Sequence, residues 1–227
     1  MSLRVIIVGG GAAGFFAAIT CAEANPAADV TLLEKSRQFL GKVRISGGGR
    51  CNVTHALFDP REFAARYPRG GRELIGLLAR FSAADTADWF ARRGVELKTE
   101  ADGRMFPVTD SSQTIVDCLV AAARAAGVKL RSGCGVREIR PGFEVVCVTG
   151  ETMVCDRVLL ATGGCRTAAG GELAVRLGHT LEPPVPSLFT FHVAGPWWGE
   201  LAGISVEPVE VRAVGLRERG AMLITHA

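Results

Sequence analysis

The chain has 227 residues, of which 48% are apolar and 22% charged, a composition typical of a globular protein with one large domain or two small ones. Its 26 basic and 23 acidic side chains give a formal net charge of +3 without a basic run, so a nucleic-acid partner is not expected. The seven cysteines include no C-x-x-C pair, and the four histidines lack the spacing of a metal site. We therefore expect a cytoplasmic chain without a metal and without a need for disulfides.

The apolar, uncharged stretch of residues 5–22 is the first segment with a clear pattern. Such a stretch can be a signal peptide or a short membrane span. Here Gly9, Gly10 and Gly11 interrupt it, and each glycine would weaken a continuous helix by roughly 1 kcal/mol. The pattern therefore favours a buried strand over residues 3–8, a tight turn, and a helix over residues 12–24, with no membrane partner.

Residues 9–14 match the dinucleotide-binding pattern G-x-G-x-x-G. In this pattern the first glycine permits a tight turn, the second lets backbone N–H groups approach a pyrophosphate, and the third brings helix and strand together. A second predicted strand, residues 30–33, ends in Glu34, which is placed to bind ribose hydroxyls. Because this carboxylate would repel a 2′-phosphate, NADP is disfavoured at this site, while FAD and NAD both remain open.

A second glycine-rich segment, residues 41–54, has the sequence GKVRISGGGRCNVT. A triple glycine is costly to order because glycine loses the most backbone entropy on folding. It is useful where backbone passes close to a ligand, since successive N–H groups form an anion-binding nest. Ser46 and Asn52 add short polar side chains on either side of the glycines.

This segment resembles the G-K-x-x-x-S-G-G-G-R-C-N-x-T motif of the BaiN-like, aminoacetone-oxidase-type family of NAD(P)/FAD-dependent oxidoreductases. The resemblance continues through residues 103–110, 160–164, 177–180 and 223–226, so it covers nearly the whole chain. It implies an α/β fold, namely a Rossmann-like FAD-binding domain of the two-nucleotide type. That domain combines a parallel sheet with a β-meander and is interrupted by a β-rich inserted domain. The implied cofactor is FAD, with NAD(P)H as a candidate electron donor.

The same resemblance implies which residues contact the cofactor. The first glycine loop would face the pyrophosphate, Glu34 the adenosine ribose, and the backbone of Val136 the adenine. Lys35 and Lys42 would lie beside the cofactor, residues 46–52 would run along the flavin, and residues 161–164 would form a second contact after a strand. The full implied set is Gly9, Gly11, Ala12, Ala13, Gly14, Glu34, Lys35, Lys42, Ser46, Gly47, Gly48, Gly49, Arg50, Cys51, Asn52, Val136, Ala161, Thr162, Gly163 and Gly164.

Cys51 and Phe106 each have two interpretations. Some flavoenzymes use a cysteine pair beside the flavin as a redox relay, but that chemistry needs a resolving thiol, and Cys51 has none within several residues. We therefore favour packing of Cys51 beneath the loop, and the same holds for Cys165, which follows Gly164. Phe106 is a candidate wall of the cofactor cleft or an ordinary packed residue.

The middle of the chain predicts structural elements rather than catalytic groups. Apolar residues at helical spacing indicate helices over residues 72–80 and 83–93, the second with Ser82 and Asp85 as a capping box and Trp89 in the core. A further helix begins within residues 109–112 and ends at Gly127. Short strands are expected at residues 128–130, 135–139, 143–148, 152–155 and 158–160, as a meander that leads back into the main sheet.

The composition changes near residue 183, where several prolines precede Trp197 and Trp198. We place a domain boundary near Ser187, which gives an FAD-binding domain at residues 1–186 and the beginning of the β-rich inserted domain at residues 187–227. Strands of the second domain are expected at residues 189–193, 204–206, 209–214 and 222–225. The two tryptophans are more simply a cover for apolar surface than the lining of a substrate cleft.

Two departures from the family pattern affect the functional prediction. Only residues 165–170 separate the A-T-G-G segment from the next helix, where family members carry a longer loop, so no substrate is transferred. Relatives also continue beyond the T-H motif and finish with another glycine-rich segment that contacts FAD. We therefore expect this chain to be the N-terminal portion of such a protein, lacking the closing segment of its FAD domain.

The favoured hypothesis is an FAD-dependent oxidoreductase in which flavin N5 accepts a hydride from NAD(P)H or an organic donor. The electrons then pass to a second small-molecule substrate or to oxygen. The alternative is a nucleotide-binding module without turnover, and a disulfide reductase is less favoured because the cysteine pair is absent. No catalytic acid or base, substrate or oligomeric state is predicted.

Overall fold

The computed structural model describes residues 2–164, 169–183, 192 and 199–225. The chain divides into two compact units, Met1–Pro184 and Val185–Ala227. Several predictions fall outside the described residues: the boundary at Ser187, the paired residues Trp197 and Trp198, the position of Cys165, and all but His192 of the strand expected at residues 189–193.

The first unit is built on a four-stranded parallel sheet with the strand order β10-β1-β2-β6. Helix α1 connects β1 to β2, and helix α6 leads into β6, so the connections are those of a Rossmann-like fold. The sheet elements are β1 (Arg4–Val8), β2 (Asp29–Leu33), β6 (Lys129–Arg131) and β10 (Arg157–Leu160), with α1 at Ala12–Ala24 and α6 at Ser112–Ala125. The fold class expected from the sequence is confirmed.

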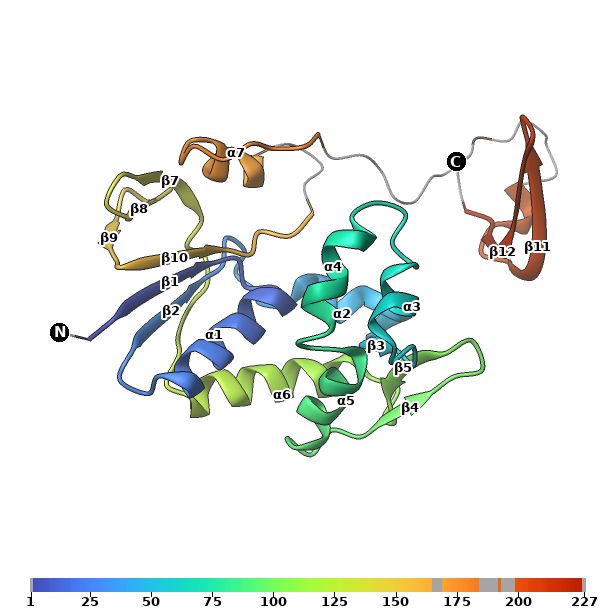
Figure 1. The fold of residues 1–227 in the computed structure, drawn as a ribbon, viewed down its shortest axis with the longest axis horizontal. Coiled ribbons are helices and arrows are strands. Elements are labelled where there is room, and N and C mark those ends of the chain that lie inside the picture. Colours follow the sequence, from blue (N-terminus) through green and yellow to red (C-terminus); the bar gives the residue numbers. More distant parts are fainter. Residues whose placement is uncertain (1, 165–168, 184–191, 193–198, 226–227) are drawn as a thin grey trace. The chain divides into compact units, whose positions relative to one another are not determined.

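Two different layers cover the two faces of this sheet (Figure 1). Helices α1 and α6 lie on one face, while the antiparallel meander of β7 (Val136–Arg140), β8 (Glu144–Cys147) and β9 (Thr152–Val154) lies on the other with α7 (Ala169–Val175). Strand β1 serves both layers because successive side chains point to opposite faces. Val5 and Ile7 belong to the helical core, whereas Ile6 and Val8 belong to the core beneath the meander.

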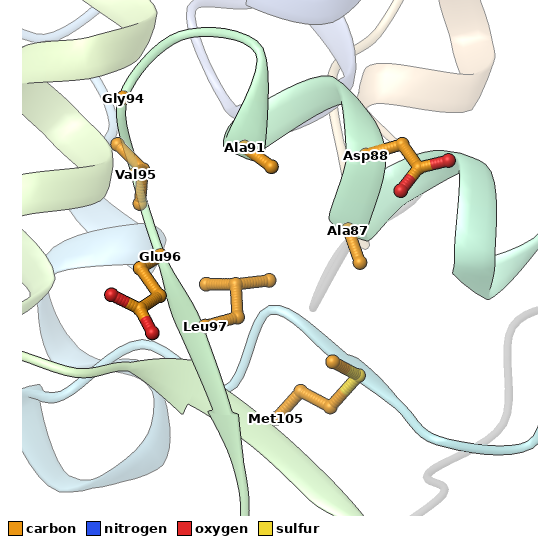
Figure 2. A pocket seen from close by; sticks show the side chains of 8 residues that line it. All are labelled: Ala87, Asp88, Ala91, Gly94, Val95, Glu96, Leu97 and Met105. Atoms are coloured by element: carbon orange, nitrogen blue, oxygen red, sulfur yellow. The ribbon is translucent and has the colours of Figure 1, made fainter.

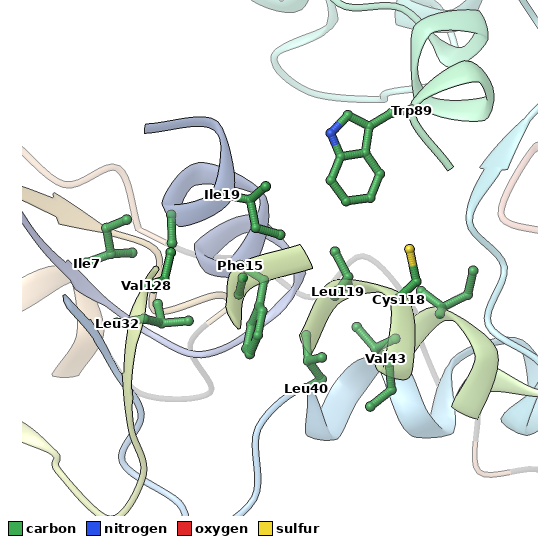
Figure 3. Packing of buried hydrophobic residues seen from close by; sticks show 14 of the residues in the cluster. Ile7, Phe15, Ile19, Leu32, Leu40, Val43, Trp89, Cys118, Leu119 and Val128 are labelled. Carbon is green, nitrogen blue, oxygen red and sulfur yellow. The ribbon is translucent and has the colours of Figure 1, made fainter. Parts of the chain in front are cut away.

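The helical core is centred on aromatic and branched side chains from several elements (Figure 3). Phe15 and Ile19 of α1 are fully buried between Leu32 of β2 and Leu119 of α6. Trp89 is also buried, and it contacts Phe16 at a ring-centroid distance of 5.5 Å. Trp89 is therefore a core residue, as the sequence predicted.

The segment between β2 and α6 contains short helices and a small antiparallel sheet. The helices are α2 (Gly41–Ile45), α3 (Pro60–Ala64), α4 (Gly71–Leu78) and α5 (Ala83–Ala91), and the sheet has the strand order β3 (Thr54–His55), β5 (Arg104–Pro107), β4 (Leu97–Thr99). The predicted capping box before α5 is present, because the Ser82 backbone N–H donates to Asp85 at 2.7 Å and the Asp85 N–H donates to the Ser82 hydroxyl at 3.2 Å. The small sheet was not predicted because its strands are too short for an alternating pattern.

The second unit contains an antiparallel hairpin of β11 (Ser205–Ala213) and β12 (Leu216–Leu223). The two strands expected at residues 204–206 and 209–214 are one strand, with a shift of register between Val206 and Val209. Pro208, which has no backbone N–H to donate, lies at this irregularity. Within the described ranges, every helix is too short or too polar to cross a membrane.

Gly14 and Gly11 provide a matched test of the packing at the start of α1. A Cβ added at Gly14 would lie 1.9 Å from the Gly9 carbonyl oxygen, whereas one added at Gly11 meets nothing within 4 Å. We expect Gly14→Ala to lower the free energy of unfolding by about 3 kcal/mol, because backbone must move, and Gly11→Ala to change it by less than about 0.5 kcal/mol. Urea denaturation followed by circular dichroism measures both, and equal midpoints for the two variants would contradict this packing.

Candidate functional site

The turn between β1 and α1 is wedged between the ends of two neighbouring strands. The Gly9 N–H donates to the Leu33 carbonyl at 2.8 Å, and the Ala161 N–H donates to the Val8 carbonyl at 2.8 Å. Gly9 has φ +115°, and an added Cβ would lie 2.3 Å from the Ala161 carbonyl oxygen. Only glycine satisfies both the backbone conformation and the available space at this position. The turn therefore brings residues 9–14 and 161–162, predicted separately for the site, into direct contact.

The N-terminus of α1 is open to an anion. Gly11 is the N-cap, no side chain caps the helix, and the first turn contains no acidic residue. Ala12 and Ala13 are exposed, and the space beside Gly11 is free of protein atoms within 4 Å of an added Cβ. The first N–H groups of a helix have no acceptor within the helix and carry a partial positive charge. This arrangement fits a pyrophosphate, the group that the glycine pattern predicts here.

Glu34 lies at the carboxyl end of β2 and is bonded to both neighbouring loops. Its Oε2 accepts from the Gly10 N–H at 2.8 Å, and its Oε1 accepts from the Ser36 N–H at 2.7 Å and the Ser36 hydroxyl at 2.8 Å. An ionised carboxylate has roughly four acceptor sites, so one remains for a hydroxyl group of a ligand. Glu34 is half-buried beside the glycine turn, in the position expected of a ribose-binding carboxylate.

The segment of residues 133–136 lies against Glu34 through backbone contacts. The Cys134 N–H donates to the Glu34 carbonyl at 2.8 Å, and the Gly133 N–H donates to the Ser36 carbonyl at 2.8 Å. A Cβ added at Gly135 would lie 3.2 Å from Cγ of Lys35, so the stem of this exposed lysine covers the segment. Val136 follows directly as the first residue of β7. The structure thus gathers Glu34, Lys35 and Val136 at one edge of the sheet.

The second glycine loop is a compact turn that closes on itself. Gly47, Gly48 and Gly49 have φ values of 56°, 68° and 86°, which L side chains rarely adopt. The Cys51 N–H donates to the Ser46 carbonyl at 3.0 Å, and the Ser46 hydroxyl donates to the Val43 carbonyl at 3.0 Å. The Ser46 hydroxyl therefore helps to close the turn after α2, while Asn52 is exposed.

Arg50 connects this loop to the small antiparallel sheet through its side-chain contacts. Its guanidinium carbon lies 4.0 Å from the centre of the Phe106 ring, and its nitrogens form ion pairs with Glu100 and, at 3.4 Å, with Asp110. Lys98 and, to a lesser degree, Arg50 hold the pKa of the Asp110 carboxyl below its ordinary value. Phe106 is fully buried under the guanidinium, so it supports the loop from below.

Cys51 is buried at the end of the loop, with 6% of its surface exposed, and belongs to the helical core. Burial raises the pKa of its thiol above the ordinary value. A thiol in this position is a poor nucleophile at neutral pH because little thiolate forms. The structure is therefore consistent with the packing role favoured from the sequence.

Lys42 connects the second glycine loop to the segment after β10. Its Nζ lies 3.4 Å from the Gly164 carbonyl oxygen and 3.7 Å from a Cβ built on Gly163. Thr162, Gly163 and Gly164 are exposed. Lys42 thus brings the predicted residues of these two segments to the same region of the first unit.

A cavity of about 370 Å³ lies elsewhere, between α5 and the small antiparallel sheet (Figure 2). Its lining is mainly apolar, with Ala91, Val95, Leu97 and Met105 among the walls, and it includes the carboxylates of Asp88 and Glu96. None of the residues predicted to bind the cofactor lines it. In the part of the chain that the structure describes, His, Cys, Asp and Glu form no group of three that could hold a metal ion.

The structure also shows a contact that sequence reasoning missed. The Sγ atoms of Cys134 and Cys147 lie 2.7 Å apart, although twelve residues separate them in the chain. The spacing contains no recognisable motif, and only the pairing of β7 with β8 brings the two side chains together.

Comparison with known proteins places this chain among relatives of greater length. Residues 3–218 match the model of the family described as "HI0933-like protein Rossmann domain". The chain is 30% identical to the 3-dehydro-bile acid delta(4,6)-reductase of Clostridium scindens, covering 98% of this chain and 56% of the relative. It is also 30% identical to the ribosomal RNA dihydrouridine synthase of Escherichia coli, covering 97% of this chain and 56% of the relative.

Among solved structures, the protein THI4 of Thermovibrio ammonificans matches with a TM-score of 0.48 and 14% sequence identity, over 77% of this chain and 62% of that chain. This chain spans about half the length of the two curated relatives described above. Since the family model covers nearly all of its residues, the chain belongs to the HI0933-like Rossmann domain family.

Proposed function

We propose that the chain is an FAD-binding part of a flavoprotein oxidoreductase. The observation that carries this proposal is the open N-terminus of α1, with free space at Gly11, directly beside the Glu34 carboxylate. The helix N-terminus attracts a pyrophosphate, and the carboxylate accepts hydrogen bonds from a ribose; these are neighbouring parts of a dinucleotide. When bound, FAD supplies a flavin N5 that accepts a hydride.

The residues of this chain would bind and orient the cofactor. Backbone N–H groups at Ala12 and Ala13 would donate to the pyrophosphate, Glu34 would accept from ribose hydroxyls, and Val136 would contact adenine through its backbone. Residues 46–52 would lie along the flavin, and Lys42 would place a positive charge near the segment of residues 161–164. With FAD bound, a positive charge there would favour negative charge on the cofactor.

The proposed reaction is hydride transfer from NAD(P)H or an organic donor, followed by reduction of a small-molecule substrate or oxygen in the cytoplasm. The Rossmann domain family, the glycine pattern and the reductase among the relatives support an oxidoreductase. The names of the two relatives point to very different substrates, a bile acid and ribosomal RNA, so we transfer neither. A nucleotide-binding module without turnover is the alternative, because this chain covers 56% of each of those relatives.

A flavin titration tests the proposal directly. The 227-residue chain is titrated with FAD, the quenching of flavin fluorescence is followed, and NADH or NADPH is then added without oxygen. Bound flavin that bleaches at 450 nm supports the oxidoreductase. Bound flavin that neither nucleotide reduces excludes NAD(P)H as the electron donor and leaves an organic donor or the module without turnover. Absence of saturable binding up to about 100 μM FAD, roughly a free energy of 5.5 kcal/mol, contradicts the oxidoreductase and the module alike.

Gly11→Ala tests whether the open N-terminus of α1 holds the cofactor. The added methyl group meets no protein atom within 4 Å, but it would occupy the space through which the pyrophosphate approaches the backbone. We expect FAD affinity to fall by about ten-fold or more, equal to about 1.4 kcal/mol, with an unchanged unfolding midpoint. Gly76→Ala in α4, which also meets nothing within 4 Å, is the matched control and should keep the parent affinity.

A further inference from the structure

Cys134 and Cys147 form a close pair of thiols next to the edge of the main sheet where Glu34, Lys35 and Val136 meet, which we call the nucleotide edge. Both side chains are free thiols, and their Sγ atoms lie 2.7 Å apart. Cys134 precedes β7 and Cys147 ends β8, so the contact joins two strands of the meander. Neither residue belongs to the site predicted from the sequence.

Backbone hydrogen bonds on both sides fix this contact. The Cys134 N–H donates to the Glu34 carbonyl, and the Cys147 N–H donates to the Glu151 carbonyl, each at 2.8 Å. Between them, the Val148 N–H donates to the Gly135 carbonyl at 2.7 Å. The two sulfur atoms therefore remain neighbours for as long as the meander is folded.

The surroundings of the pair favour a covalent bond between the sulfurs over metal binding. Cys134 is 6% exposed and Cys147 fully buried, in a core that also contains Ile6, Leu33 and Val145. Among the described residues, no third His, Cys, Asp or Glu completes a metal site with them. Burial, with a smaller effect of the neighbouring thiol, raises the pKa of Cys147 to about 12. The Cys147 thiol is therefore protonated at neutral pH.

We propose that Cys134 and Cys147 are an oxidation site that closes to an intramolecular disulfide when the protein meets a peroxide. Cys134 adjoins exposed Ser132 and Gly133, so hydrogen peroxide reaches it first. Its sulfur attacks one peroxide oxygen, the O–O bond breaks, and a sulfenic acid and one water form. The sulfur of Cys147 then attacks Cys134, its proton leaves with the departing hydroxide as a second water, and the S–S bond forms. Two thiols lose two electrons in all, and one peroxide gains them.

The disulfide would tie the nucleotide edge of the main sheet to the meander. Cys134 is one backbone hydrogen bond away from Glu34, whose side chain in turn holds the Gly10 N–H. Oxidation would therefore add a covalent bond to the hydrogen bonds and core contacts that hold residues 133–136 in the reduced protein. The formation of this disulfide requires no flavin, so its test is independent of the proposed function.

Peroxide treatment, followed by proteolysis and mass spectrometry of the peptides, tests the proposal on the unmodified 227-residue chain. The protein is reduced, desalted, treated with hydrogen peroxide under native conditions, and then unfolded and alkylated with iodoacetamide. We expect the loss of two alkylatable thiols and a peptide pair that links Cys134 to Cys147, both reversed by dithiothreitol. Sulfinic acid at Cys134 with Cys147 still alkylated, or a link between other cysteines, would overturn the proposal.

Thermal unfolding supplies an independent readout. A disulfide that closes a short loop restricts the unfolded chain, so the oxidised protein should unfold at a temperature higher by roughly 5 to 10 °C. Cys134→Ala and Cys147→Ala should each abolish this difference between oxidised and reduced protein. Cys118→Ala, at a buried free cysteine in the helical core, should retain it. A shift that persists in Cys134→Ala would refute the assignment even if the variant is less stable.

Discussion

The close approach of backbone to backbone at the turn between β1 and α1 is the constraint on which the rest of the site depends. Gly9 fits between the ends of β2 and β10 because it has no side chain, and Gly14 fits over the Gly9 carbonyl for the same reason. This packing places the N-terminus of α1 at the edge of the sheet where β2 ends before Glu34 and β10 ends before Ala161. In a parallel sheet the carboxyl ends of the strands share one edge, so residues distant in sequence meet there.

The layers on the two faces of the sheet support different parts of the candidate site. On one face, Phe15, Ile19 and Leu119 are buried between α1 and α6 and so hold α1, whose N-terminus has no side-chain cap. On the other face, the meander supports Glu34 from behind through Cys134. A change in the meander would therefore reach Glu34 through the Cys134 N–H, and it would reach the glycine turn through the bond between the Glu34 side chain and the Gly10 N–H.

Much of the first unit could be predicted because its elements have strong local patterns. The bounds of α1 follow from the glycines before it, and the strands at β1, β2 and β10 follow from short apolar runs. The small sheet of β3, β4 and β5 could not be predicted, since it is held by pairings between distant short strands rather than by periodicity. The ion-pair partners of Arg50 could not be predicted for a related reason. Glu100 and Asp110 are fifty and sixty residues away in the chain, and no local pattern marks them.

Two kinds of interaction hold the two halves of the candidate site. The nucleotide edge rests on backbone hydrogen bonds beside two buried cores, which salt affects little. The loop of residues 46–52 rests instead on half-exposed ion pairs of Arg50 and on the contact of its guanidinium with Phe106. Exposed or partly exposed ion pairs contribute little each, typically about 0 to 1 kcal/mol, and salt weakens them. Since its glycines also permit many backbone conformations, we expect this loop to be the less rigid half of the candidate site.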